Sequence, residues 1–219
     1  MSTKTVDLTP ALQRYIGECH SYAGDPLLAE LRQETATLGS VSQMQISPEQ
    51  GTFLSILVAA LGVRAPVEIG TFTGYSALCM ARALPPQGHL TCFDVSDTWT
   101  AIARRYWERA GVSDRITLQL GDAAKTLAEV PEEPRFDFAF IDADKTGYDT
   151  YFELLLPRLQ PGSLLIFDNM LWGGRLTTEV LENPNGIAID ALNRKLAQDP
   201  RVESVLLPVA DGLHLCRKR

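Results

Sequence analysis

Short apolar segments alternate with amphipathic segments through most of this chain. The apolar segments have the length and composition of buried strands, and they are residues 66–70, 89–95, 115–121, 136–143 and 162–169. The segments between them carry apolar residues at helical spacing, and they are residues 74–85, 96–111, 122–130 and 146–159. This alternation predicts a mostly parallel sheet that is covered by helices on both faces.

Before the first strand, the pattern predicts helices. Two of them span residues 10–18 and 26–38. A third begins after Ser47, which can cap it, with Pro48 at the first helical position and Gln50 completing a capping box. The N-terminal segment, residues 1–45, is therefore expected to be mainly helical.

The other end of the chain has strand character. Residues 201–219 contain two apolar segments around an Asp-Gly turn, which predicts an antiparallel hairpin. With the five preceding strands, this hairpin completes a seven-stranded sheet. A length of 219 residues fits one large α/β domain, so we expect a single domain over residues 1–219.

Acidic side chains stand at or just beyond the carboxyl ends of the predicted strands, where open α/β sheets bind their ligands. They are Glu68, Asp94, Asp122, Asp142 and Asp168. Two of these ends, in the motifs "DADK" and "DN", also carry further polar groups. Because a lone buried carboxylate is costly, two neighbouring strand ends of this kind indicate a bound cation.

The loop after the first strand, "EIGTFTGYS", indicates the kind of cofactor. Gly70 and Gly74 form a turn that admits a ligand close to the backbone. The dinucleotide-binding pattern needs another glycine at the position of Phe72, and a pyrophosphate would lie unfavourably beside Glu68. A cofactor with a positive centre and no phosphate, such as S-adenosylmethionine, suits the loop better. A plain tight turn is the alternative.

Two further acidic residues fit the same cofactor. Asp94 can accept both hydroxyls of a ribose; it could also cap a helix, although Ser96 or Asp97 already serves that purpose. Asp122 and Ala123 follow the third strand, where an adenine would lie. Asp122 could equally cap the next helix, and the sequence leaves both possibilities open.

Composition and charge narrow the class of partner. Lys and Arg number 20 against 27 Asp and Glu, and a net charge of −7 argues against a nucleic acid or an anionic membrane. No apolar run approaches the roughly 20 residues of a membrane span, and the start lacks a signal peptide, which predicts a cytoplasmic protein. The four scattered cysteines predict buried free thiols, and the three histidines lack zinc-ligand spacing.

The motifs "VEIGTFTGYSALCMA", "FAFIDADKTGYDTYFE", "PGSLLIFDNMLWGG" and "LLPVADGL" resemble the cation-dependent O-methyltransferases of the caffeoyl-CoA and catechol type. The resemblance extends from about Met44 to the C-terminus. It implies the Rossmann-like class I methyltransferase fold, S-adenosylmethionine as cofactor and a homodimer. It also implies a divalent cation, with Mg²⁺ preferred and Ca²⁺ or Mn²⁺ as alternatives.

The resemblance assigns roles to individual residues. It implies that Asp142, Asp168 and Asn169 hold the cation, and that Lys145, as the base, and Asp142 are the catalytic residues. The cofactor contacts that it implies are Ile46 through its backbone, Glu68, Gly70, Thr71, Ser76, Asp94, Ala123, Asp142 and Asp144.

The acceptor is less defined. We expect a small aromatic molecule with two adjacent hydroxyls, contacted by Lys145 and by Trp172 as a pocket wall, with residues 1–45 contributing to the acceptor site and the dimer. Tyr148 and Tyr151 are expected to pack. Departures from the family pattern at Ser163, Met170 and Gly173 leave the acceptor open. Two other functions compete: an S-adenosylmethionine-binding module with an inactive acceptor site, and a nicotinamide-dependent oxidoreductase.

Overall fold

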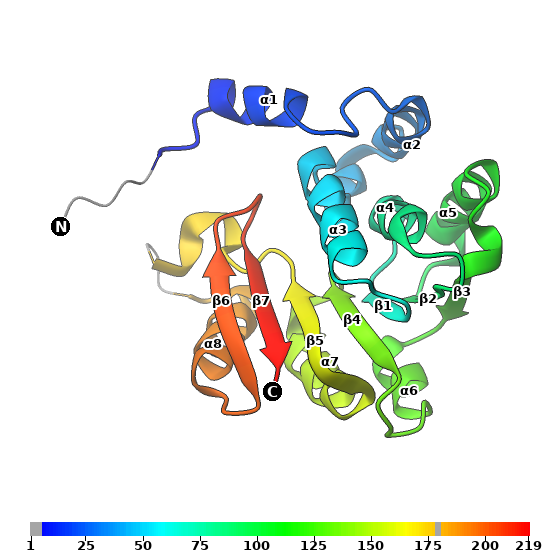
Figure 1. Ribbon diagram of the computed structural model, residues 1–219. Coiled ribbons are helices and arrows are strands. Elements are labelled where there is room, and N and C mark those ends of the chain that lie inside the picture. Colours follow the sequence, from blue (N-terminus) through cyan, green and yellow to red (C-terminus); the bar gives the residue numbers. More distant parts are fainter. Residues whose placement is uncertain (1–5, 178–180) are drawn as a thin grey trace.

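The fold is built on one twisted sheet, seen in a computed structural model that describes residues 6–177 and 181–219 (Figure 1). Its strands are β1 Pro66–Ile69, β2 Leu90–Asp94, β3 Ile116–Leu120, β4 Phe136–Ile141, β5 Leu159–Phe167, β6 Val202–Leu207 and β7 Leu213–Lys218. The seven strands lie in the order β3-β2-β1-β4-β5-β7-β6. Strands β1 to β5 pair in parallel, and β7 runs antiparallel to both β5 and β6. The predicted fold class is confirmed.

Helices cover both faces of the sheet (Figure 1). On one face lie α2 Pro26–Ala36, α3 Pro48–Ala60, α4 Tyr75–Ala83 and α5 Asp97–Arg109, with α1 Pro10–Glu18 beyond α3. On the other lie α6 Ala123–Ala128, α7 Tyr148–Leu155 and α8 Pro184–Gln198. Short 3₁₀ helices are η1 Gly39–Met44, η2 Ser113–Arg115, η3 Lys145–Gly147, η4 Leu156–Arg158 and η5 Trp172–Thr177. Strand residues alternate between the two cores: Phe138 and Phe140 enter one, and Ala139 and Ile141 the other.

Helix α8 has no counterpart among the predicted helices, although its sequence carries the signals. The Asn183 side chain caps the helix by accepting from the Asn185 N–H at 2.9 Å, and buried residues recur at Ile189, Leu192 and Leu196. Its Asn193 amide donates to the Met170 carbonyl at 2.8 Å. Helix α8 therefore supports the loop that follows β5.

The first turns of α6 and α3 show how the residues predicted to cap these helices are used. Asp122 Oδ1 accepts from the Ala124 N–H at 3.0 Å, so Asp122 is the cap of α6. Ser47 Oγ accepts from the Gln50 N–H at 3.4 Å, as predicted for α3. The Gln50 side chain is buried, but among the described residues no hydrogen bond joins the Ser47 N–H to its oxygen, so the predicted capping box is wrong in its second half.

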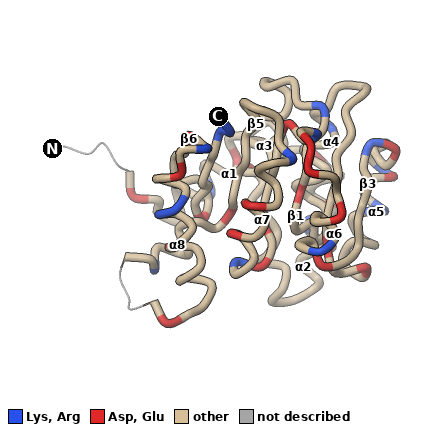
Figure 2. The backbone as a smooth tube through the Cα atoms, turned by 90° about the horizontal axis from the view of Figure 1, so that it is seen from below, with Lys and Arg blue, Asp and Glu red and all other residues tan. Residues whose placement is uncertain are grey.

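Charged residues are interspersed over the elements (Figure 2). Where α2 meets α5, Glu34 pairs with Arg105 and Glu30 pairs with Arg109, which ties the N-terminal segment to the sheet domain. No helix within residues 6–177 and 181–219 is long and apolar enough to cross a membrane.

Three of the four free cysteines are buried, as predicted. They are Cys79, Cys92 and Cys216. Cys19 is exposed, so the prediction of burial is wrong for it, because α1 lies at the margin of the core and buries none of its own residues.

Gly70 is the point where the loops after β1 and β4 touch. Its φ is +89°, and a Cβ built on it would lie 2.0 Å from the carbonyl oxygen of Asp142. The peptide of Gly70 is also anchored, because its N–H donates to the Phe93 carbonyl at 2.9 Å. Only glycine permits this close approach of two backbones.

We predict that Gly70→Ala destabilises the fold by about 2–5 kcal/mol, since a left-handed conformation and a backbone overlap both oppose the methyl group. The matched control is Gly62→Ala, because Gly62 has φ +63° but no atom within 4 Å of the place that an added methyl group would occupy. That variant should lose only about 1–2 kcal/mol. Denaturant unfolding measures both, and equal losses would contradict the role assigned to the Gly70–Asp142 contact.

Candidate active site

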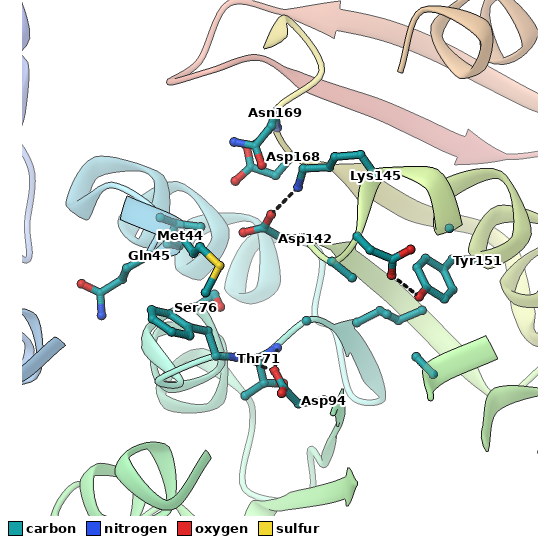
Figure 3. Close-up of a pocket in the computed structure, with 18 of the residues that line it drawn as sticks. Met44, Gln45, Thr71, Ser76, Asp94, Asp142, Lys145, Tyr151, Asp168 and Asn169 are labelled. Atoms are coloured by element: carbon teal, nitrogen blue, oxygen red, sulfur yellow. Dashed lines mark hydrogen bonds and ion pairs between the residues drawn. The ribbon is translucent and has the colours of Figure 1, made fainter. Parts of the chain in front are cut away.

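A cavity of about 1210 Å³ opens at the carboxyl ends of the parallel strands. Its walls come from residues 43–47, from the loop after β1, and from the ends of β2, β4 and β5. Figure 3 shows polar side chains from these separate segments facing a common space. The strand ends thus meet as the sequence predicted.

Most of the predicted site residues line this cavity. They are Ile46, Gly70, Thr71, Ser76, Asp94, Ala123, Asp142, Asp144, Lys145, Asp168, Asn169 and Trp172. Glu68 does not line it, because its side chain on β1 points into the core beneath. There it accepts from Ser76 Oγ at 2.5 Å, and burial raises the pKa of Glu68 to about 7. Glu68 thus orients Ser76 from below.

The glycine loop is held by the carboxylate at the end of β2. Asp94 Oδ2 accepts from the Thr71 N–H at 2.9 Å and from the Phe72 N–H at 2.7 Å. Asp94 Oδ1 accepts from the Ser96 N–H at 2.7 Å. Phe72 adopts φ +51° and packs edge-on against Trp99, with ring centroids 5.1 Å apart. The loop amides are therefore committed to a carboxylate and are not presented to a phosphate.

The two strand ends that predict a cation do meet. Lys145 Nζ forms an ion pair with Asp142 Oδ1 at 2.9 Å, and both side chains are largely buried. Asp168 is 2% exposed, and burial together with the Asp142 charge raises its pKa to about 7, opposed by the Gln50 amide and the Asn169 N–H. Asn169 has φ +58°, an unusual conformation that directs its amide beside these carboxylates (Figure 3).

The ligands predicted for the cation do not form a cluster of acidic or imidazole side chains alone. Among the described residues, no three His, Cys, Asp or Glu side chains gather as a metal cluster would require. The predicted set instead combines the carboxylates Asp142 and Asp168 with the Asn169 amide. Buried like charges of this kind are relieved by a cation, so the residues present fit a hard divalent ion.

The tyrosines on α7 have polar contacts in the site as well as packing. Tyr148 is fully buried; its hydroxyl accepts from Lys145 Nζ at 2.6 Å and donates to the Asp168 carbonyl at 3.1 Å. Burial holds the pKa of Tyr148 well above its usual range, so it stays neutral. Tyr151 donates to Asp144 Oδ1 at 2.5 Å. The prediction that assigned both to packing is therefore incomplete.

The N-terminal segment braces the cavity wall next to the glycine loop through residues that the sequence analysis missed. Arg32 Nη1 donates to the Ile46 carbonyl at 3.0 Å and to Gln45 Oε1 at 3.3 Å. Gln45 Nε2 donates to the hydroxyls of Thr35 and Thr73, each at 3.0 Å. Helix α2 is thereby linked to the glycine loop. Nothing in the spacing of these residues signals the link, since their partners are distant in sequence.

At the other side of the cavity, a short loop carries the predicted acceptor wall. Trp172 has φ +52°, and the Arg175 guanidinium lies over its ring, 4.8 Å from the centroid. Asp211, in the turn between β6 and β7, accepts from the Gly173 N–H at 2.6 Å. The C-terminal hairpin thus positions the loop that bears Trp172.

Comparison with known proteins agrees with this geometry. A family model described as O-methyltransferase matches residues 18–219. The caffeoyl-CoA O-methyltransferase of Populus kitakamiensis is 36% identical over 229 aligned positions, which cover 100% of this chain and 97% of that protein.

Solved structures agree as well. The O-methyltransferase from Bacillus cereus, in complex with SAH, is 32% identical with a TM-score of 0.87, covering 95% of this chain and 97% of that one. The O-methyltransferase TomG from Streptomyces achromogenes, in complex with SAM, is 27% identical with a TM-score of 0.82, covering 89% and 90%. Fold, cavity and sequence agree that this chain belongs to the O-methyltransferase family.

Proposed function

We propose that this enzyme transfers the methyl group of S-adenosylmethionine to one hydroxyl of an aromatic molecule with two adjacent hydroxyls, and that it requires a divalent cation. One observation carries the proposal. Asp142, Lys145, Asp168 and Asn169 converge on one space within the cavity that the glycine loop also borders (Figure 3).

The cofactor side of the cavity fits S-adenosylmethionine, which would supply a methyl group on a sulfonium. Asp94 Oδ1 accepts one backbone N–H and keeps a lone pair for a ribose hydroxyl. The SAH and SAM complexes of the two relatives support this choice.

The cation site would be made by Asp142, Asp168 and Asn169. Oxygen ligands of this kind suit Mg²⁺ first, and Ca²⁺ or Mn²⁺ as alternatives. A divalent ion held there would supply the positive charge that favours an ionised acceptor hydroxyl. The raised pKa of Asp168, caused by burial and the Asp142 charge, supports a site suited to a positive charge.

Lys145 is the proposed base. Its Nζ is fixed by Asp142 and Tyr148, at 2.9 and 2.6 Å, so the amine has a defined position at the edge of the proposed cation site. In its neutral form it can accept the proton of the acceptor hydroxyl, and Asp142 then stabilises the resulting ammonium. Trp172, held by the hairpin, is the proposed wall for the aromatic ring.

The competing functions are disfavoured by particular contacts. A nicotinamide dinucleotide needs loop amides for its pyrophosphate, whereas the N–H groups of Thr71 and Phe72 already donate to Asp94. An S-adenosylmethionine-binding module with an inactive acceptor site would not need the amine of Lys145 to be fixed beside the proposed cation site. Homodimerisation stays a prediction, which sedimentation at micromolar concentration would test.

We predict that Asp94→Ala raises the dissociation constant for S-adenosylmethionine by roughly 10–100-fold, because it removes a charged hydrogen-bond acceptor and frees the glycine loop. Isothermal titration calorimetry measures this. Asp97→Ala is the control, since its carboxylate is 74% exposed on α5 and should leave the affinity unchanged. Binding of NAD in place of S-adenosylmethionine by the wild type would refute the proposed cofactor.

Lys145→Ala should keep its affinity for S-adenosylmethionine but lose roughly 10²–10⁴-fold in kcat on a catechol, the range typical of general acid–base catalysis. Single-turnover assays with a labelled methyl donor measure the chemical step. The loss should shrink for nitrocatechols, because a more acidic hydroxyl needs the base less.

Lys125→Ala is the matched control, because that lysine is 82% exposed and pairs with Asp122 at the surface. Wild-type turnover should also disappear on chelation and return with Mg²⁺. Undiminished turnover after exhaustive chelation would exclude the cation, and full activity of Lys145→Ala would exclude the base.

A further inference from the structure

The short segment between η1 and α3 forms one wall of the cavity and is anchored from behind. Residues 43–47 all line the cavity. Gln45 has an extended backbone, with φ −74° and ψ 131°. In Figure 3 the Gln45 amide points away from the acidic side chains, whereas Met44 from the same segment reaches toward them. The side chain of Gln45 is therefore directed at the rest of the protein.

The Gln45 amide is engaged at both of its polar atoms. Its Nε2 donates to the hydroxyls of Thr35 and Thr73, each at 3.0 Å, and its Oε1 accepts from Arg32 Nη1 at 3.3 Å. Thr35 is 1% exposed, Thr73 is fully buried, and their two oxygens lie 2.9 Å apart. Because buried hydroxyls are costly to leave without partners, this set of contacts favours one position of the amide.

Arg32 holds the same segment at a second point. Its Nη1 also donates to the Ile46 carbonyl at 3.0 Å, so one guanidinium nitrogen binds both the backbone and a side chain of the wall. The guanidinium carbon lies 5.5 Å from the centroid of the Tyr75 ring. Tyr75 is the first residue of α4 and follows the glycine loop directly. Helix α2 thus contacts the wall and the end of the glycine loop together.

The glycine loop is consequently held from two directions. Asp94 accepts from the N–H groups of Thr71 and Phe72 on one side, and Gln45 donates to the Thr73 hydroxyl on the other. The wall and the loop both line the cavity. If the link between them were lost, part of the binding free energy would be used to order the wall, and the apparent affinity would fall with the fraction of molecules that are already ordered.

We propose that Gln45 is a positioning residue for S-adenosylmethionine: its amide holds the wall of residues 43–47 against the glycine loop and couples the docking of α2 to cofactor binding. This role rests on the cofactor proposed above. Since such coupling is reciprocal, binding of the cofactor should in turn strengthen the docking of α2.

The test uses the full-length protein and S-adenosylhomocysteine as the probe. Gln45→Met keeps the length of the side chain but removes its donor and acceptor, and it should raise the dissociation constant in calorimetry roughly 10-fold. Hydrogen exchange reports the coupling directly. In the wild type, S-adenosylhomocysteine should slow exchange in both the glycine loop and α2, whereas in Gln45→Met it should slow exchange in the loop alone.

Two further variants separate this role from the general docking of α2. Arg105→Met removes the partner of Glu34 on α2, so it loosens α2 from α5 but leaves the contacts of Gln45 in place, and it should bind the probe as the wild type does. Thr73→Val removes the contact with Gln45 from the other side. The variant that combines Thr73→Val with Gln45→Met should lose no more affinity than the weaker-binding single variant, because both break the same link.

The outcomes separate this inference from the proposed function. Wild-type affinity in both Gln45→Met and Thr73→Val, or additive losses in the combined variant, would overturn the role of Gln45 and leave the proposed cofactor standing. An equal loss in Arg105→Met would reduce the network to general docking of α2 and overturn the coupling. If the wild type does not bind S-adenosylhomocysteine, the cofactor and the role of Gln45 fall together. If Gln45→Met does not fold, the affinity of Thr73→Val decides the question.

Discussion

The close approach of two backbones at Gly70 is the constraint on which the cavity depends. A side chain there would overlap the Asp142 carbonyl, so the loop after β1 and the loop after β4 can meet only at a glycine. One of these loops borders the proposed cofactor site, and the other begins the proposed cation site. In the proposed reaction, their contact would bring the methyl donor and the acceptor hydroxyl into one cavity, where positioning can supply much of the rate.

Negative charge is the second determinant of the site, and it is compensated in two ways. At Asp94, three backbone N–H groups satisfy the carboxylate, and the bonds from Thr71 and Phe72 also fix the glycine loop. At Asp142 and Asp168, one lysine amine and neutral donors compensate only part of the charge, and burial together with the Asp142 charge keeps the pKa of Asp168 raised. The satisfied charge of Asp94 fixes the glycine loop, and the incompletely compensated charge of Asp142 and Asp168 supports the proposed cation site.

Segments outside the parallel sheet complete the cavity. Helix α2 reaches the cofactor side through Arg32 and Gln45, helix α8 supports the loop after β5, and the C-terminal hairpin holds Trp172 through Asp211. The sheet and its loops carry the proposed chemistry, while these surrounding elements support the rest of the cavity wall.

The amino-acid pattern was enough to predict the sheet, its hairpin and the meeting of the acidic strand ends. Strand periodicity is a local pattern, and the carboxyl ends of parallel strands lie at one edge of a sheet. Helix α8 was also readable from its cap and apolar spacing. Local sequence patterns leave several side-chain directions open, and tertiary packing settled them: Glu68 faces the core, Asp122 caps α6, Tyr148 bonds to Lys145, and Gln50 is buried at the cavity wall. Each depends on side-chain direction and on partners distant in sequence, which are brought together only when the helices pack on the sheet.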